Sequence, residues 1–142
     1  MFKGKKVLVL GLAKSGKAAV ELLKFMHADI TINESKKKED IPEYDTYVSE
    51  GIEMVCGGQP DELFERDFDF VVKNPGINYH APFILRLKER GIPVYTEIEL
   101  GYKVAKKQHY IAVTGTNGKT TTVTLIYEIL KACLLYTSDA AD

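Results

Sequence analysis

The sequence is poor in cysteine and histidine, the residues that form disulfides and most structural metal sites. It has two cysteines and three histidines in 142 residues. Cys56 and Cys133 form no C-x-x-C pair, and the histidines are scattered along the chain. We therefore expect no disulfide framework and no metal centre built on these residues. The same scarcity favours a reducing, cytoplasmic compartment.

Long apolar runs and an excess of one charge are also absent. No apolar run approaches the roughly 20 residues that cross a membrane. Nineteen Lys and Arg oppose 20 Asp and Glu, for a net charge of −1, which argues against a general nucleic-acid-binding protein. The start, MFKGKKVLVLG, has the basic and apolar order of a signal peptide, but its apolar part runs into a glycine after VLVL, which favours a first strand.

The sequence does contain alternating strand-like and helix-like segments within a composition that is 45% hydrophobic. We predict strands at residues 6–10, 30–33, 52–56, 68–73 and 92–95, and helices around 19–26, 61–65, 81–90 and 97–107. The polar stretch up to residue 50 fits neither pattern. A turn is predicted at Asn74-Pro75-Gly76, with the glycine at a positive dihedral angle. The alternation predicts an α/β fold with a parallel sheet between helices.

Three turns are expected at the carboxyl ends of the strands, where parallel sheets bind ligands. They lie at residues 11–16, 33–35 and 74–76. The charged segment at residues 103–108 is the best candidate for a domain boundary. Beyond it, a strand at residues 110–113, a glycine loop and a helix with apolar residues at 123, 126, 127 and 130 follow in the order that a phosphate-binding loop needs.

The first glycine turn, GLAKSG, nearly matches the dinucleotide-binding pattern G-x-G-x-x-G. Its middle glycine is replaced by Ala13, whose Cβ obstructs a close approach to a pyrophosphate. Glu34 lies about 20 residues on, where a ribose-binding acid belongs. The Rossmann-like fold is therefore favoured over NAD binding. Backbone N–H groups at the start of the next helix suit a phosphate, whereas Ser15 as a mere helix cap is the structural alternative.

The second glycine loop, GTNGKT, has only two residues between its glycines and Val113 where the standard phosphate loop begins with glycine. The physical requirements of such a loop are still met. Small residues expose backbone N–H groups, Lys119 places a cation near terminal phosphates, and Thr120 offers a hydroxyl to Mg²⁺. The structural alternative is a plain strand-to-helix turn with a solvated lysine and an N-capping threonine.

These motifs together resemble the Mur ligase family. T-G-T-N-G-K-T-T is similar to its ATP loop, whereas the related folylpolyglutamate synthases usually have G-K-G at Gly118-Lys119-Thr120. GLAKSGKAA, VVKNPGI and TEIELG resemble the members that add D-glutamate to UDP-N-acetylmuramoyl-L-alanine. The resemblance covers about residues 3–131. It implies a Rossmann-like UDP-sugar-binding domain at residues 1–107, then the truncated start of a P-loop ATPase domain at residues 108–132.

The resemblance also implies the ligands and the residues that hold them. ATP and Mg²⁺ are expected as cofactors, and UDP-N-acetylmuramoyl-L-alanine and D-glutamate as substrates of a monomer. The expected ATP-binding residues are Gly115, Thr116, Asn117, Gly118, Lys119, Thr120 and Thr121. Lys119 and Thr120 would be catalytic, with Thr120 on the metal. The UDP-sugar contacts would fall on Lys14, Ser15, Asn33, Glu34, Ser35 and Gly76, with the choice between Asn33 and Glu34 for uridine left open.

In the implied chemistry, ATP phosphorylates the substrate carboxylate, and the amine of D-glutamate then displaces the phosphate to form an amide. The family's general base, second metal ligand and D-glutamate pocket lie further along the chain. The final residues, CLLYTSDAAD, depart from the family, in which the helix ends near Ala132. We expect residues 133–142 to be an atypical, non-native end and this fragment to be inactive. An NAD(P)-binding Rossmann module and a non-catalytic nucleotide-binding fragment remain the alternatives.

Overall fold

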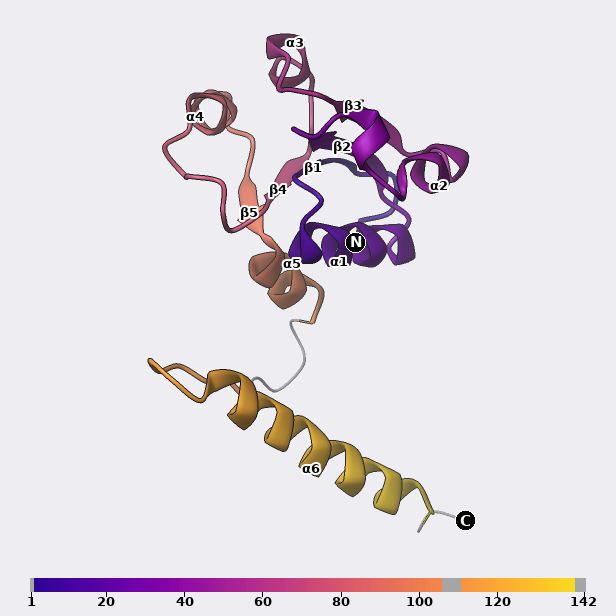
Figure 1. Cartoon of the computed structure of the whole chain (residues 1–142), viewed down its shortest axis with the longest axis vertical. Coiled ribbons are helices and arrows are strands. Elements are labelled where there is room, and N and C mark those ends of the chain that lie inside the picture. Colours follow the sequence, from indigo (N-terminus) through magenta and orange to yellow (C-terminus); the bar gives the residue numbers. More distant parts are fainter. Residues whose placement is uncertain (1, 106–110, 140–142) are drawn as a thin grey trace. The chain divides into compact units, whose positions relative to one another are not determined.

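The computed structural model describes residues 2–105 and 111–139. The chain divides into two compact units, Met1–Lys106 and Lys107–Asp142, and each is described here by itself. The first unit contains a sheet with helices on both faces (Figure 1). The second contains a glycine loop and one helix. Among the described residues, no helix combines the length and apolar character needed to span a membrane.

The sheet of the first unit has five strands, all parallel, in the order β3-β2-β1-β4-β5. The strands are β1 (Lys6–Leu10), β2 (Asp29–Glu34), β3 (Glu53–Cys56), β4 (Phe70–Lys73) and β5 (Val94–Thr96). The order changes direction between β1 and β4, and such switch points in Rossmann-type sheets are where ligands bind. The register places Asn33, Leu10 and Lys73 side by side at the carboxyl edge.

The helices cover the sheet in two layers, as the apolar run of β1 requires. Val7 and Val9 face one core, and Leu8 and Leu10 face the other. The first core is covered by α1 (Lys14–Phe25), α2 (Tyr44–Ser49) and α5 (Glu97–Val104), and the second by α3 (Asp61–Phe64) and α4 (Pro82–Glu89). Figure 1 shows α1 and α5 on one side of the sheet and α3 and α4 on the other. A strand that is buried on both faces does not alternate apolar and polar residues, which explains the apolar run in the β1 sequence KVLVL.

The five strands and four helices predicted for the first unit are confirmed, with small changes at their ends. The polar stretch that fitted no pattern forms a short 3-10 helix, η1 (Lys38–Asp40), and then α2. Two residues of this stretch, Ile41 and Tyr47, are buried. Packing against the rest of the fold therefore determines the structure of the stretch. The helix predicted to reach residue 107 is α5, which ends at Val104; residues 106 and 107 lie outside the described part.

One prediction about local geometry in the first unit is wrong, and so is the structural alternative given for Ser15. Ser15 does not cap α1, because Ala13 occupies the N-cap position and Ser15 lies inside the first turn. Gly76 does not have a positive φ. Its turn is closed by a hydrogen bond from the Ile77 N–H to the Asn74 carbonyl at 3.0 Å, and a turn of type I keeps both central residues at negative φ.

The second unit contains α6 (Lys119–Asp139) preceded by the glycine loop. The strand predicted at residues 110–113 is wrong for residues 111–113, which have no regular structure; Tyr110 lies outside the described residues. A strand needs a neighbouring strand to pair its backbone groups, and residues 111–139 contain no other. The α6 backbone continues past Ala132 to Asp139. Its apolar side chains Val123, Leu125, Tyr127 and Ile129 are exposed.

Candidate functional site

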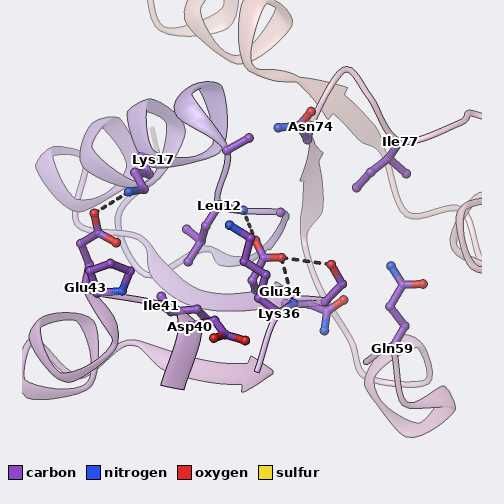
Figure 2. A pocket seen from close by; sticks show the side chains of 15 residues that line it. Leu12, Lys17, Glu34, Lys36, Asp40, Ile41, Glu43, Gln59, Asn74 and Ile77 are labelled. Atoms are coloured by element: carbon purple, nitrogen blue, oxygen red, sulfur yellow. Dashed lines mark hydrogen bonds and ion pairs between the residues drawn. The ribbon is translucent and has the colours of Figure 1, made fainter. Parts of the chain in front are cut away.

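A pocket of about 300 Å³ lies at the carboxyl edge of the sheet in the first unit. Three of the segments that line it follow β1, β2 and β4, at the carboxyl ends of strands where the sequence predicted ligands. The pocket therefore lies at the switch in strand order. Its size is at the lower end of the range for small-molecule sites. Figure 2 shows its lining, which comprises Gly11, Leu12, Ala13, Lys17, Asn33, Glu34, Ser35, Lys36, Asp40, Ile41, Pro42, Glu43, Gln59, Asn74 and Ile77.

The first wall is the glycine turn between β1 and α1. Gly11 has φ +87°, a conformation that favours glycine. Gly16 permits close packing of the helix on the turn, because a Cβ there would lie 1.9 Å from the Gly11 carbonyl oxygen. The first-turn N–H groups of α1 have no partner within the helix, and the first turn has no acidic residue. This end of α1 therefore suits an anion.

Glu34, at the end of β2, holds that turn. Its Oε2 accepts a hydrogen bond from the Leu12 N–H at 2.6 Å, and its Oε1 accepts from the Ser35 hydroxyl at 3.1 Å and the Lys36 N–H at 3.2 Å. Figure 2 shows these bonds converging on the carboxylate. Burial of the carboxyl alone would raise its pKa, but the backbone donors Leu12 and Lys36, with Ser35, outweigh burial and lower the pKa. The carboxylate therefore bonds to the protein itself, and this weakens the NAD alternative, which would use it for a ribose.

Asn33 lies deeper than Glu34 and is 3% exposed. Its side-chain amide donates to the carbonyls of Val55 at 3.0 Å and Gly58 at 2.7 Å. The donors of the amide are thus directed to the end of β3 and the loop after it. Asn33, Glu34 and Ser35 all line the pocket, and the side chains of all three already form hydrogen bonds within the protein.

The opposite wall is the turn after β4. The Asn74 side chain accepts a hydrogen bond from the Gly76 N–H at 2.9 Å through Oδ1 and donates to the Ser15 hydroxyl at 3.3 Å through Nδ2. Asn74 therefore connects this turn to the first glycine turn. Sequence reasoning placed the turn correctly but selected Gly76 for the site and missed Asn74. Lys14, Ser15 and Gly76 are not among the residues that line the pocket.

A third boundary of the pocket comes from the polar stretch that the sequence left unassigned. It contributes Lys36, Asp40, Ile41, Pro42 and Glu43. The Lys17 ammonium of α1 forms an ion pair with Glu43, and its hydrogen bond lowers the pKa of the Glu43 carboxyl. None of these residues belongs to a recognisable motif, so only the folded chain reveals their place in the site.

The second glycine loop lies in the other unit, where it leads into the N-terminus of α6. Gly115 has φ +149° and Gly118 has φ +78°, both in the region that favours glycine. The Lys119 ammonium donates to the carbonyls of Gly115 and, at 3.2 Å, Thr116. Thr120 and Thr121 lie in the first turn of α6, where backbone N–H groups have no partner within the helix.

This loop fits the phosphates of a nucleotide, because a lysine, glycine-dependent curvature and helix N-terminal donors occur together. Thr120, whose hydroxyl the sequence assigns to Mg²⁺, lies in the first turn of α6. Within the described residues, no group of three or more His, Cys, Asp or Glu is arranged to hold a metal ion. The structure thus contains two candidate binding elements, one in each unit.

Comparison with known proteins finds one family model and relatives that match most of the chain. Residues 5–96 match the family described as Mur ligase MurD-like, N-terminal domain. The UDP-N-acetylmuramoylalanine–D-glutamate ligase of Streptococcus agalactiae is 49% identical over 131 residues, which cover 92% of this chain and 29% of the ligase. This chain therefore spans less than a third of the length of that relative.

Two solved structures share the fold. A pseudomurein peptide ligase type C from Methanothermus fervidus matches with a TM-score of 0.59 and 28% identity, over 91% of this chain and 26% of the ligase. The UDP-N-acetylmuramate-alanine ligase MurC of Thermotoga maritima matches with a TM-score of 0.57 and 25% identity, over 89% of this chain and 29% of MurC.

Proposed function

The chain belongs to the Mur ligases through a MurD-like N-terminal domain, and we propose that this domain binds the UDP part of UDP-N-acetylmuramoyl-L-alanine. The protein of which it forms part would be the ligase that adds D-glutamate to this substrate in peptidoglycan synthesis. The support is the family match over residues 5–96 and the similarity to the D-glutamate ligase of Streptococcus agalactiae. Such a protein would work as a monomer in the cytoplasm, where UDP-sugars and ATP are available.

The observation that carries this proposal is the position of the pocket. It is bounded by the start of α1 and by the segments that follow β2 and β4, at the switch in strand order where Rossmann-type sheets hold nucleotides. The helix N-terminus suits a diphosphate, and Lys14 and Ser15 in its first turn are assigned to that group. Ser35 and the exposed Gly76 are assigned to the uridine side.

Asn33 and Glu34 take a different part in the proposal. Their polar atoms already bond within the protein, so we assign them to shaping the uridine pocket in addition to any direct contact. Glu34 would hold the Leu12 N–H and thereby fix the turn that meets the phosphates. This refines the expectation that one of the two simply contacts uridine.

The second unit is assigned to ATP. Residues Gly115, Thr116, Asn117, Gly118, Lys119, Thr120 and Thr121 would hold its phosphates, and Thr120 would offer its hydroxyl to Mg²⁺. When bound, ATP supplies the phosphoryl group that activates the substrate carboxylate for amide formation with D-glutamate. Lys119 would orient the terminal phosphates and neutralise charge that develops there. For this it would leave the loop carbonyls of Gly115 and Thr116.

The first test is a calorimetric titration of the 142-residue chain with UDP-N-acetylmuramoyl-L-alanine, and in parallel with NADH. We expect saturable binding of the UDP-sugar and none of NADH. UDP alone should compete, because the proposed contacts lie on the nucleotide. Binding of NADH without any response to the UDP-sugar would contradict the proposal and favour a dinucleotide-binding module.

The second test concerns catalysis in the whole ligase that contains this segment. Phosphate release that depends on both ATP and D-glutamate is expected, and Lys119→Ala should abolish it. Lys131→Ala, on the same helix but away from the loop, is the matched control and should retain turnover. Unchanged turnover in Lys119→Ala would remove Lys119 from its assigned role.

A further inference from the structure

Lys73 is a buried lysine that the proposed chemistry does not use. It ends β4 and is 1% exposed. In the sheet register it lies between Leu10 of β1 and Thr96 of β5, at the edge that carries the pocket. Lysines are almost never fully buried unless they are paired, so the partners of this ammonium group indicate why the chain keeps it.

The Lys73 ammonium is directed to the turn that follows its own strand. Its Nζ donates to the carbonyl of Ile77 at 2.8 Å and to that of Asn74 at 3.3 Å. The Tyr79 ring covers it, with Nζ 4.0 Å from the ring centroid, a distance typical of a cation–π contact. One lysine therefore joins the first and last residues of the turn and the aromatic residue just beyond it.

Other charged groups surround this lysine. The pKa of Lys73 is lowered, because burial of the ammonium outweighs the opposing effect of Glu97 and Glu99. Lys88 lies over the same Tyr79 ring at 4.8 Å, but it is exposed. Burying a cation is unfavourable unless its hydrogen bonds are satisfied. The hydrogen bonds to the two carbonyls and the contact with the Tyr79 ring meet this requirement.

The turn held by Lys73 is a wall of the pocket. Asn74 and Ile77 line it, and Asn74 donates to the Ser15 hydroxyl at the start of α1. Displacing the Asn74 backbone would therefore move the side chain that connects the two glycine-containing turns. No other lysine among the described residues is as buried as Lys73.

We propose that Lys73 is a positioning residue that fixes the turn at residues 74–77 as one wall of the UDP-sugar pocket. This inference rests on the function proposed above for that pocket. Lys73 acts through the backbone carbonyls of Asn74 and Ile77 and does not touch the ligand. Its removal should loosen the wall while the sheet stays intact.

The test compares Lys73→Met with Lys88→Met in the 142-residue chain. Both remove an ammonium group beside Tyr79, but only the first removes the two carbonyl bonds. In Lys73→Met we expect amide exchange at Gly76 and Ile77 to accelerate about tenfold or more, and binding of UDP-N-acetylmuramoyl-L-alanine to weaken about tenfold. Exchange at Val9 and Ile32 in the sheet should stay at the wild-type rate, and Lys88→Met should match the wild type throughout.

Each outcome decides the question. Unchanged exchange at Gly76 and Ile77, or faster exchange with unchanged binding, would overturn the inference. If Lys73→Met does not fold, Lys73→Gln, which removes the charge and keeps an amide with two N–H donors on a shorter side chain, takes its place under the same criteria. If the wild-type chain does not bind the UDP-sugar, the proposed function fails by itself, and the exchange rates alone decide whether Lys73 fixes the turn.

Discussion

The turn at residues 11–16 and the loop at residues 115–118 both lead the chain into the N-terminus of a helix, but different contacts hold them. The first is packed by Gly16 against the Gly11 carbonyl and is bonded by Glu34 from a neighbouring strand. The second is exposed, and its hydrogen bonds come from Lys119 and Thr122 within the same segment.

This difference separates a loop motif from a pocket whose walls are held by tertiary contacts. Small residues before a helix supply curvature and free backbone N–H groups in both places. Among the described residues, the first unit alone has a sheet that fixes the direction of those groups through residues distant in sequence, such as Glu34 and Asn74. The effects of substitution should therefore differ sharply between the two, even where the residue types are the same.

The largest expected effect is at Gly16. In Gly16→Ala, the new Cβ would meet the Gly11 carbonyl oxygen at 1.9 Å, so either α1 or the turn must move. We expect the free energy of unfolding of the first unit to fall by about 3 kcal/mol, as measured by urea denaturation followed by circular dichroism.

Gly101→Ala is the matched control, because Gly101 is helical and has nothing within 4 Å of an added Cβ. It should stabilise the unit by roughly 0.5–1 kcal/mol. Similar effects at the two positions would show that close packing at the turn is unimportant, and would remove the contrast between the two loops.

The next largest effect is expected at Glu34. In Glu34→Gln, the buried acceptor of the Leu12 N–H loses its charge, so unfolding should become easier by about 1–3 kcal/mol at pH 7. Glu89→Gln, at an exposed position on α4, should change stability by less than about 0.5 kcal/mol. Equal stability of the two variants at pH 7 would rule out Glu34 as the residue that holds the turn.

The same carboxylate predicts a dependence on pH. The pKa of Glu34 is lowered in the folded chain. The contribution of this carboxylate to the free energy of unfolding is therefore fully present above the pKa of the unfolded chain, about 4.3. This contribution is lost as pH falls through the lower pKa that Glu34 has in the folded chain. Between pH 7 and pH 3, the free energy of unfolding of Glu34→Gln should therefore fall less steeply than that of the wild type. A parallel loss in both proteins would contradict the lowered pKa.

A smaller effect is expected where the two turns of the first unit meet. Asn74→Ala removes the bonds to Gly76 and Ser15 and should reduce stability by about 1 kcal/mol. Ser15→Ala removes only the longer bond of 3.3 Å and should cost about 0.5 kcal/mol. A double-mutant cycle measures their coupling. Strict additivity would mean that the Ser15–Asn74 bond does not join the walls of the pocket.

The smallest effect on stability is expected in the second loop. Lys119→Met removes bonds to exposed carbonyls, so the free energy of unfolding should change by less than about 0.5 kcal/mol. Circular dichroism during thermal unfolding provides the measurement. A loss as large as that in Glu34→Gln would show that the second loop is also held as a built structure.

The sequence predicted the sheet well because a parallel strand buried on both faces is a short apolar run, as in Lys6–Leu10. It also placed three turns correctly at the carboxyl edge of the sheet. It did not predict α2, since Ile41 and Tyr47 are buried only through contacts with the rest of the fold. The expected strand failed at residues 111–113 for a similar reason, because a strand forms only with a pairing partner.

Side-chain partners were the least predictable part of the site. The spacing placed Glu34 correctly at the end of β2, but spacing cannot show that the carboxylate is directed at the Leu12 N–H. Lys73 follows two valines in a strand, where a terminal lysine is ordinarily solvated. Its burial depends on the turn and on Tyr79 together, a tertiary arrangement that composition does not encode. The assignments of Lys14, Ser15, Ser35, Gly76 and the second loop to ligands remain predictions.

The register of β1 has a consequence for how the unit folds. Its neighbours come from very different distances along the chain: Val7 pairs with Ile30 on one side and with Phe70 on the other. Closing the second, longer loop is slower and entropically less favourable. The pocket lies at this late junction, so it can exist only after β4 has docked. A ligand that binds there would select fully folded chains, and its binding would report completion of folding more sharply than helix content does.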